Sequence, residues 1–194
     1  MLLLVISLIL FLGIHLTRVI APGWRASVIA AKGERAWKLG YTLASIATLV
    51  LVVYAFGQAR HVTGILYTPP VWIAHLSSLL MLVAMICLVA SLMPPGHIAT
   101  KTKHPMVLSV KIWALAHLLA NGETFSVILF VAFLAWGVVL RIALKRRERN
   151  GELVRKPFVS ARYDAAAVVI GTVVYLLFIW RLHVWLIGVQ PLPI

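Results

Sequence analysis

Acidic residues and cysteine are scarce in this sequence. Of its 194 residues, five are Asp or Glu against 18 Lys and Arg, and Cys87 is the only cysteine. A single cysteine excludes an internal disulfide and any metal site built from several thiolates. The long apolar segments contain no carboxylate, and the chain has neither a Gly-x-Ser-x-Gly elbow nor a glycine-rich phosphate-binding loop. Hydrolase chemistry therefore has no support in the sequence.

Apolar residues, by contrast, are abundant and make up 62% of the chain. A soluble domain of this size cannot hide that much apolar surface, so the composition predicts a polytopic membrane protein. The first segment lacks the basic start and the cleavage site of a signal peptide, and we expect it to be a mature helix. The expected fold class is an all-α membrane helix bundle, a single domain over residues 1–194 with about six transmembrane helices. The six apolar segments are Leu2–Thr17, Leu39–Gly57, Val71–Met93, Met106–Ala120, Thr124–Leu140 and Ala165–Ile187.

Basic residues are distributed unevenly between the connections. Sixteen of the 18 Lys and Arg lie in or beside the first, third and fifth connections, and only Arg60 and Arg181 lie on the other side. By the positive-inside rule, both termini lie outside the cytoplasm, in a multi-pass protein of the cytoplasmic (inner) membrane. The formal charge of +13 then matches anionic lipid headgroups, and nucleic acid is not expected as a partner. In the polar stretch Arg141–Asp164, Glu148 and Glu152 are expected to be solvated partners of neighbouring arginines.

One segment departs from the plain apolar pattern. It begins at His104 and reads HPMVLSVKIWALAHLLANG. Pro105 suits the first turn of a helix, and the closing Asn-Gly pair suits its end. On that helix Trp113, His117 and Asn121 share one face, and we expect Asn121 to orient the free ring nitrogen of His117. Because polar side chains inside a membrane are costly, this face is a candidate functional site.

Histidine is the residue type that most strongly suggests a cofactor. Three of the seven histidines lie inside apolar segments: His15, His75 and His117. Neutral imidazole is a good ligand for haem iron, copper or zinc, whereas a single histidine in a membrane helix is often a hydrogen-bonded packing residue. Spacing alone leaves both readings open. Solvated or headgroup-level side chains are expected for the histidines near segment ends, namely His61, His97 and His183.

The motifs of this chain resemble those of the NnrU family. The likeness rests on Thr-Lys-His-Pro-Met at 102–106, Trp-Ala-Leu-Ala-His at 113–117 and Asn-Gly at 121–122, together with Gly-Ile-His at 13–15 and Arg-Ala-Trp-Lys-Leu-Gly-Tyr at 35–41. NnrU proteins are bacterial integral membrane proteins found in the context of denitrification and nitric oxide metabolism. Their domain is similar to that of the plant and cyanobacterial zeta-carotene isomerases, which are haem b proteins.

The resemblance implies a haem b site whose axial ligands match His15 and His117, with His104 as a further histidine of the shared motif. In the isomerases a cysteine stands three residues before the second ligand, and Ala114 replaces it here. Exchange between thiolate and imidazole, and with it carotene isomerisation, is therefore not expected. A redox- or nitrogen-oxide-linked role remains, isomerase-like or oxidoreductase-like if the protein is an enzyme, with a small apolar molecule or a nitrogen oxide as ligand.

Helix geometry suggests a different partner for His117. With straight helices and a rise of about 1.5 Å per residue, the Cα atoms of His15 and His117 differ in depth by ~14 Å. His75 lies near the outer end of its segment and closer to the level of His117. The resemblance thus favours His15 as the second ligand, and the depth argument favours His75.

Two other classes of function fit parts of the sequence. Membrane methyltransferases of the isoprenylcysteine type resemble it in a His-Pro segment followed by a helix, with acidic residues in a later basic loop. Here Lys103 stands in place of their arginine, and Glu148 or Glu152 in place of the acidic pair. Such an enzyme binds S-adenosylmethionine on the cytoplasmic side, where His104 is expected to lie. The third reading is a non-enzymatic accessory subunit or haem-handling factor that packs on a membrane partner protein.

Overall fold

Helices account for nearly all of the fold. The computed structural model describes residues 1–62 and 64–192, and within them the only β-type pairing is an isolated bridge between Ile65 and Glu123. This confirms the all-α fold class. In chain order the elements are α1 (Leu2–His15), α2 (Thr17–Ile20), α3 (Pro22–Ala59), α4 (Val71–Leu92), α5 (His97–Thr102), α6 (Pro105–Ala120), α7 (Thr124–Arg149), α8 (Arg162–Leu177), the π-helix η1 (Phe178–Leu182) and α9 (His183–Ile187).

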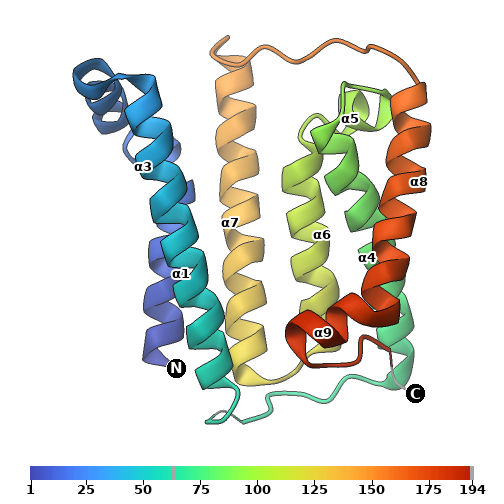
Figure 1. The fold of residues 1–194 in the computed structure, drawn as a ribbon. Helices are drawn as coiled ribbons and strands as arrows, with labels where there is room; N and C mark the ends of the chain where they lie inside the picture. Colours follow the sequence, from blue (N-terminus) through green and yellow to red (C-terminus); the bar gives the residue numbers. More distant parts are fainter. Residues whose placement is uncertain (63, 193–194) are drawn as a thin grey trace.

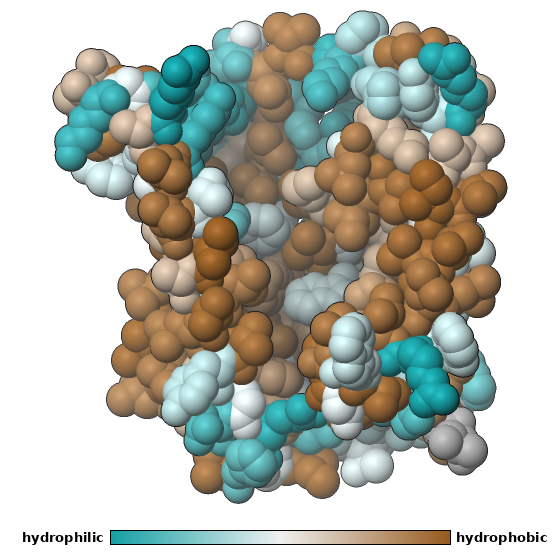
Figure 2. Space-filling model, in the orientation of Figure 1, coloured by the Kyte–Doolittle hydropathy of each residue, from teal (hydrophilic) through white to brown (hydrophobic). Residues whose placement is uncertain are grey.

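Length divides the apolar helices into two groups. Four stretches of the described chain are long and apolar enough to cross a membrane: Pro22–Ala59, Val71–Leu92, Thr124–Arg149 and Arg162–Ile187. α1 and α6 are apolar but shorter. Apolar side chains cover much of the middle of the molecule, and polar side chains gather at its two ends (Figure 2). This is the surface expected of a protein whose middle faces lipid, so the polytopic membrane bundle is confirmed, and all six predicted segments are helical.

The helices form two groups with α7 between them (Figure 1). α1 packs against α3 and α7, while α6 links α7 to α4, which packs in turn against α8. The buried core of the first group combines side chains from α1, the end of α3 and the start of α7: Leu4, Leu8, Val52, Ala55, Ala59, Phe125, Leu129 and Phe130. In a bilayer such side-chain packing, rather than exclusion of water, drives helices together. α7 is therefore the element that joins the two groups.

α7 extends further than the apolar pattern predicts. The sequence predicts an end at Leu140, whereas the helix continues to Arg149, so the first part of the polar stretch from Arg141 is helical. Leu, Lys, Arg and Glu are strong helix formers, and basic side chains interact favourably with the C-terminal end of a helix. Hydropathy indicates where a helix leaves the apolar layer, but it carries no information on where the helix ends.

The sixth segment is not one straight helix. The sequence predicts a single helix over Ala165–Ile187, whereas the structure divides this part of the chain into α8, η1 and α9. After η1 the chain turns, and α9 runs across the end of the bundle (Figure 1). Gly188 takes a left-handed conformation with φ 78° and ends α9. Hydropathy gives no sign of such a bend, because a π-turn differs from an α-turn in its hydrogen bonding.

α8 approaches α4 so closely that a side chain at Gly171 has no room. A Cβ atom added there lies 2.8 Å from the Cα of Ile86. Ala167, one turn earlier on the same face of α8, is fully buried, and small residues at this spacing let membrane helices approach closely. One turn beyond Gly171, the hydroxyls of Ser78 and Tyr175 share a hydrogen bond of 2.6 Å. Close packing and this hydrogen bond together fix α8 on α4.

The start of α1 and the described residues that follow α9 lie at the same end of the bundle, opposite α5 and the connection between α7 and α8 (Figure 1). Because the basic connections gather at that opposite end, we predict that the termini lie outside the cytoplasm. A reporter that is active only in the cytoplasm should be silent when fused after Ile194. The same reporter inserted after Gly151 should be active, which controls for expression. Activity at the C-terminus would contradict the predicted orientation.

Candidate functional site

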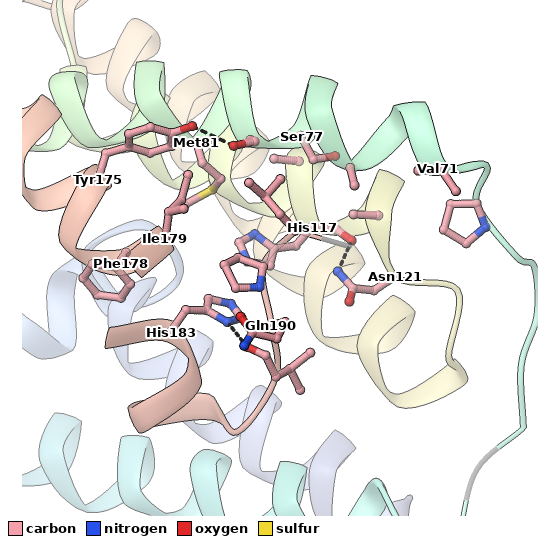
Figure 3. Close-up of a pocket in the computed structure, with 18 of the residues that line it drawn as sticks. Val71, Ser77, Met81, His117, Asn121, Tyr175, Phe178, Ile179, His183 and Gln190 are labelled. Carbon is pink, nitrogen blue, oxygen red and sulfur yellow. Dashed lines mark hydrogen bonds between the residues drawn. The ribbon is translucent and has the colours of Figure 1, made fainter. Parts of the chain in front are cut away.

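A cavity of about 650 Å³ opens between α4, α6 and the bend that follows α8 (Figure 3). Its apolar walls include Met81, Met85, Phe178 and Ile179. Its polar side chains include Ser77, Ser78, His117, Asn121, Tyr175 and His183. A cavity of this size, mostly apolar with a few polar groups, is typical of sites for small molecules and cofactors.

His117 lies in this cavity with its ring held by the backbone of α6. Its Nδ1–H donates to the carbonyl of Trp113, 3.0 Å away. A carbonyl only accepts, so the bond places the proton of the neutral imidazole on Nδ1 and leaves the electron pair of Nε2 free. The expectation that Asn121 orients the ring is wrong, because its amide donates to the carbonyl of His117 instead, at 2.7 Å. Helical side chains lean toward the N-terminus, which favours the carbonyl one turn earlier.

His183 is the neighbour of His117 in the cavity (Figure 3). The centroids of the two rings are 6.3 Å apart, and the ring planes differ by 20°. The Nδ1–H of His183 donates to the carbonyl of Val189 at 2.7 Å, so the Nε2 of this ring is free as well. The sequence alone predicts only a solvated or headgroup-level side chain at this position. The sequence does contain one indication that they are neighbours: His117 and His183 both lie near the C-terminal ends of their apolar segments.

His15 lies in a different cavity, of about 340 Å³, formed by the end of α1 with α2, α3 and α7. Its Nδ1–H donates to the carbonyl of Phe11 at 2.7 Å, and the ring of Tyr41 is 5.7 Å away. The cationic residues Arg18, Arg25 and Arg147 also line this cavity. The structure does not bring His15 next to His117, and their pairing on one iron stays a prediction.

A row of aromatic rings connects the two cavities. The centroid distances are 4.4 Å from His15 to Phe11, 5.9 Å from Phe11 to Phe133, 5.2 Å from Phe133 to Trp113 and 5.4 Å from Trp113 to His117. These separations are those of stabilising aromatic contacts. Trp113, predicted to share the functional face, therefore packs between α6 and α7 and does not line the cavity of His117.

The other histidine considered as a ligand, His75, is exposed on α4 and lines neither cavity. Among residues 1–62 and 64–192, no group of three or more His, Cys, Asp or Glu side chains could hold a metal ion. A closed zinc site needs about four protein ligands, whereas haem iron needs only one or two because the porphyrin supplies the rest.

His104 lies at the opposite end of α6, in a cluster with Glu148 that only the methyltransferase resemblance indicated. Its Nε2 is 2.8 Å from Oε1 of Glu148, whose Oε2 accepts a hydrogen bond of 2.6 Å from Arg155. The side chain of Glu148 is only 9% exposed, so the expectation of a solvated Glu148 is wrong. The extra length of α7 carries it over the start of α6. Burial, followed by the charge of Arg141, lowers the pKa of His104, and the hydrogen bond to Glu148 opposes that shift.

A second large cavity, of about 610 Å³, lies beside this cluster. It combines positive side chains, Lys103, Arg155 and Lys156, with apolar ones such as Met106 and Phe158. Glu152 does not line it. As the sequence predicts, Glu152 is exposed beside an arginine, with 3.5 Å between its Oε2 and the Nε of Arg147. The two acidic residues of this region therefore have different surroundings.

Comparison with known proteins gives one match. The family model described as NnrU protein matches residues 3–191, nearly the whole chain. Neither the curated proteins nor the solved structures contain a match. The match confirms the resemblance that the sequence motifs indicated.

Proposed function

The chain belongs to the NnrU protein family, and we propose that it binds haem b in the cavity around His117. The family and the apolar helices make it a membrane protein. The proposal adds a redox- or nitrogen-oxide-linked role in denitrification-type metabolism, carried out in the cytoplasmic membrane. A nitrogen oxide or another small, apolar molecule is the proposed ligand.

The observation that carries this proposal is the arrangement of His117. Its Nδ1–H is tied to the carbonyl of Trp113, and its Nε2 is left free in a cavity. A ligating histidine in proteins usually donates its other ring N–H to a carbonyl or carboxylate in this way, which fixes the tautomer and the ring orientation. When bound, haem supplies one-electron and small-ligand chemistry. The part played by the chain is to present Nε2, to hold the ring still and to keep the site apolar.

The lining of the cavity fits the group. Its volume of about 650 Å³ is in the usual range of cofactor sites, ~300–1,000 Å³. Met81, Met85 and Phe178 offer apolar surface to a porphyrin, and there is no Asp or Glu among the described residues that line the cavity. The Oγ of Ser77 is buried without a hydrogen-bond partner in the part of the chain that the structure describes. An unpaired buried hydroxyl is costly, and a bound ligand can satisfy it.

The test is the absorbance spectrum of the protein purified in detergent after expression with ample haem. We expect a Soret band and, after reduction, a six-coordinate low-spin spectrum of imidazole type. Thiolate character is not expected, because Ala114 stands where the isomerases have cysteine. A haem-free protein would refute the proposal. A stoichiometric partner co-purifying with haem-free protein would favour the accessory-subunit reading.

One observation favours a second candidate, an S-adenosylmethionine-dependent membrane methyltransferase. His104 and Glu148 are 44 residues apart in the sequence, yet they contact each other beside a cavity of about 610 Å³. The methyltransferase reading needs these two residues to act together at the end of the bundle predicted to be cytoplasmic. Arg155 and Lys156 also offer positive charge to the carboxylate of S-adenosylmethionine.

This candidate predicts that Glu148→Gln weakens S-adenosylmethionine binding by at least about tenfold, because it removes the charge shared by His104 and Arg155. Isothermal titration of the detergent-purified protein measures the effect. Glu152→Gln is the matched control and should bind as the wild type does, since Glu152 does not line the cavity. A wild-type protein that gives no binding heat with S-adenosylmethionine would exclude this function.

A further inference from the structure

We propose that the haem iron is held between His117 and His183, and not between His117 and His15. This inference rests on the proposed function and assigns its second axial ligand. It concerns a residue from the far end of the chain, which neither the sequence motifs nor the family match singles out. Three features of the pair support it: the distance between the two rings, their hydrogen bonds and the bend that places His183.

The spacing of the rings is that of two imidazoles on one metal ion. Two imidazoles that bind one ion through Nε2 from opposite sides, at ~2.1 Å each, have ring centroids about 6 Å apart. The observed separation of His117 and His183 is 6.3 Å, with the ring planes within 20° of each other. Side chains from α6 and α9 thus already stand at a distance that suits a shared ligand.

Both rings have the same tautomer and the same free nitrogen atom. Each donates its Nδ1–H to a backbone carbonyl, that of Trp113 for His117 and that of Val189 for His183. Because neither carbonyl can donate, each neutral ring has its proton on Nδ1 and its free electron pair on Nε2. A ligating histidine donates its other ring N–H to a carbonyl in this way, and His117 and His183 are neighbouring rings that both meet this condition.

The bend after α8 places His183 beside His117. A straight continuation of α8 would carry the chain along α4, whereas η1 turns it so that α9 crosses toward α6 (Figure 1). Phe178 and Ile179 of η1 line the cavity that the bend creates. The Nη1 of Arg60 donates to the carbonyl of Ile187 at 2.9 Å and ties the end of α9 to the end of α3. π-turns within helices are frequent at functional sites, which agrees with a role for this one.

His15 lacks these features. It lines another cavity, and three aromatic rings stand between it and His117 along the row described above. Its ring also has a free Nε2, because Nδ1 bonds to Phe11, but His15 is the only histidine among the described residues that line its cavity. His15 and His117 could share an iron only after a rearrangement of α1 against α6.

Three variants of the full-length protein test the assignment by their absorbance and electron paramagnetic resonance spectra. In His183→Ala, the six-coordinate low-spin haem should become five-coordinate and high-spin, with His117 as the remaining ligand. In His183→Met, the haem should stay six-coordinate with a histidine–methionine spectrum and a raised reduction potential. In His15→Ala, the matched control, the wild-type spectrum should be unchanged.

The outcomes separate this inference from the function on which it rests. A haem-free wild-type protein would overturn both. A wild-type protein with low-spin haem whose spectrum is unchanged in His183→Met would overturn the inference alone, as would a change to high spin in His15→Ala. If His183→Ala proves too unstable to purify, His183→Met decides the question, because methionine fills the space and still offers the iron a ligand.

Discussion

Replacement of His117 by alanine should lower the haem content of the purified protein at least about tenfold, since changes at the outer partners of metal ligands alone typically cost about 10–100-fold in affinity. This loss of haem is expected regardless of which histidine is the second ligand, because His117 is common to every pairing considered. α6 should remain helical, since alanine is the best helix former, although the variant loses the hydrogen bond of the ring to the carbonyl of Trp113 and its aromatic contacts with Trp113 and Phe130. The ratio of Soret absorbance to protein concentration measures the effect.

Two controls accompany this variant. His75→Ala removes an exposed histidine that does not line the cavity and should keep its haem. Imidazole added to His117→Ala should restore part of the Soret band, because the cavity has room for the missing ring. Wild-type haem content in His117→Ala would show that the haem lies elsewhere. Equal loss in His75→Ala would point to a general defect of folding.

Replacement of Gly171 by valine should destabilise the protein by about 1–3 kcal/mol, the usual cost of overpacking a well-packed contact. A Cβ there meets the Cα of Ile86 at 2.8 Å and its N at 3.0 Å. These are backbone atoms, so relief requires α8 to move away from α4 as a whole. That movement strains the hydrogen bond between Ser78 and Tyr175. The midpoint of thermal unfolding in detergent should fall accordingly.

Gly40→Val is the matched control for this prediction. Gly40 is also inside a helix, α3, but a Cβ there has no neighbouring atom within 4 Å. Both variants introduce the same β-branched side chain, so the helix propensities cancel in the comparison. Gly171→Val should therefore unfold at a clearly lower temperature than Gly40→Val. Equal midpoints would mean that close packing of α8 on α4 contributes little to stability.

Much of the fold could be predicted from local patterns. Every apolar segment is helical, because a chain in lipid must satisfy its backbone hydrogen bonds internally. Pro105 begins α6, as its place in the first turn indicates. The end of α7 was missed because hydropathy falls at Leu140 while the helix continues. The bend at η1 was missed because a change from α-helical to π-helical hydrogen bonding has no signature in hydropathy.

The candidate site was predictable only in part, for a related reason. His117 stands out because it is a polar residue in an apolar segment. Its neighbour His183 and the pair of His104 with Glu148 depend on which helices pack together. Single-sequence patterns describe one helix at a time and carry no information on that packing. For Trp113 the error is the opposite one: the sequence predicted it at the site because it shares a helix face with His117, but it does not line the cavity.

The core beneath α1 has a consequence for biosynthesis. Leu4 and Leu8 are translated first, but Phe125 and Leu129, which cover them, belong to α7 and are translated much later. The hairpin of α1 and α3 must therefore wait in the bilayer, incompletely packed, until α7 has been inserted. During that interval it is exposed to chaperones and membrane proteases. A substitution that slows insertion of α7 should thus reduce the yield of the protein even where its folded stability is unchanged.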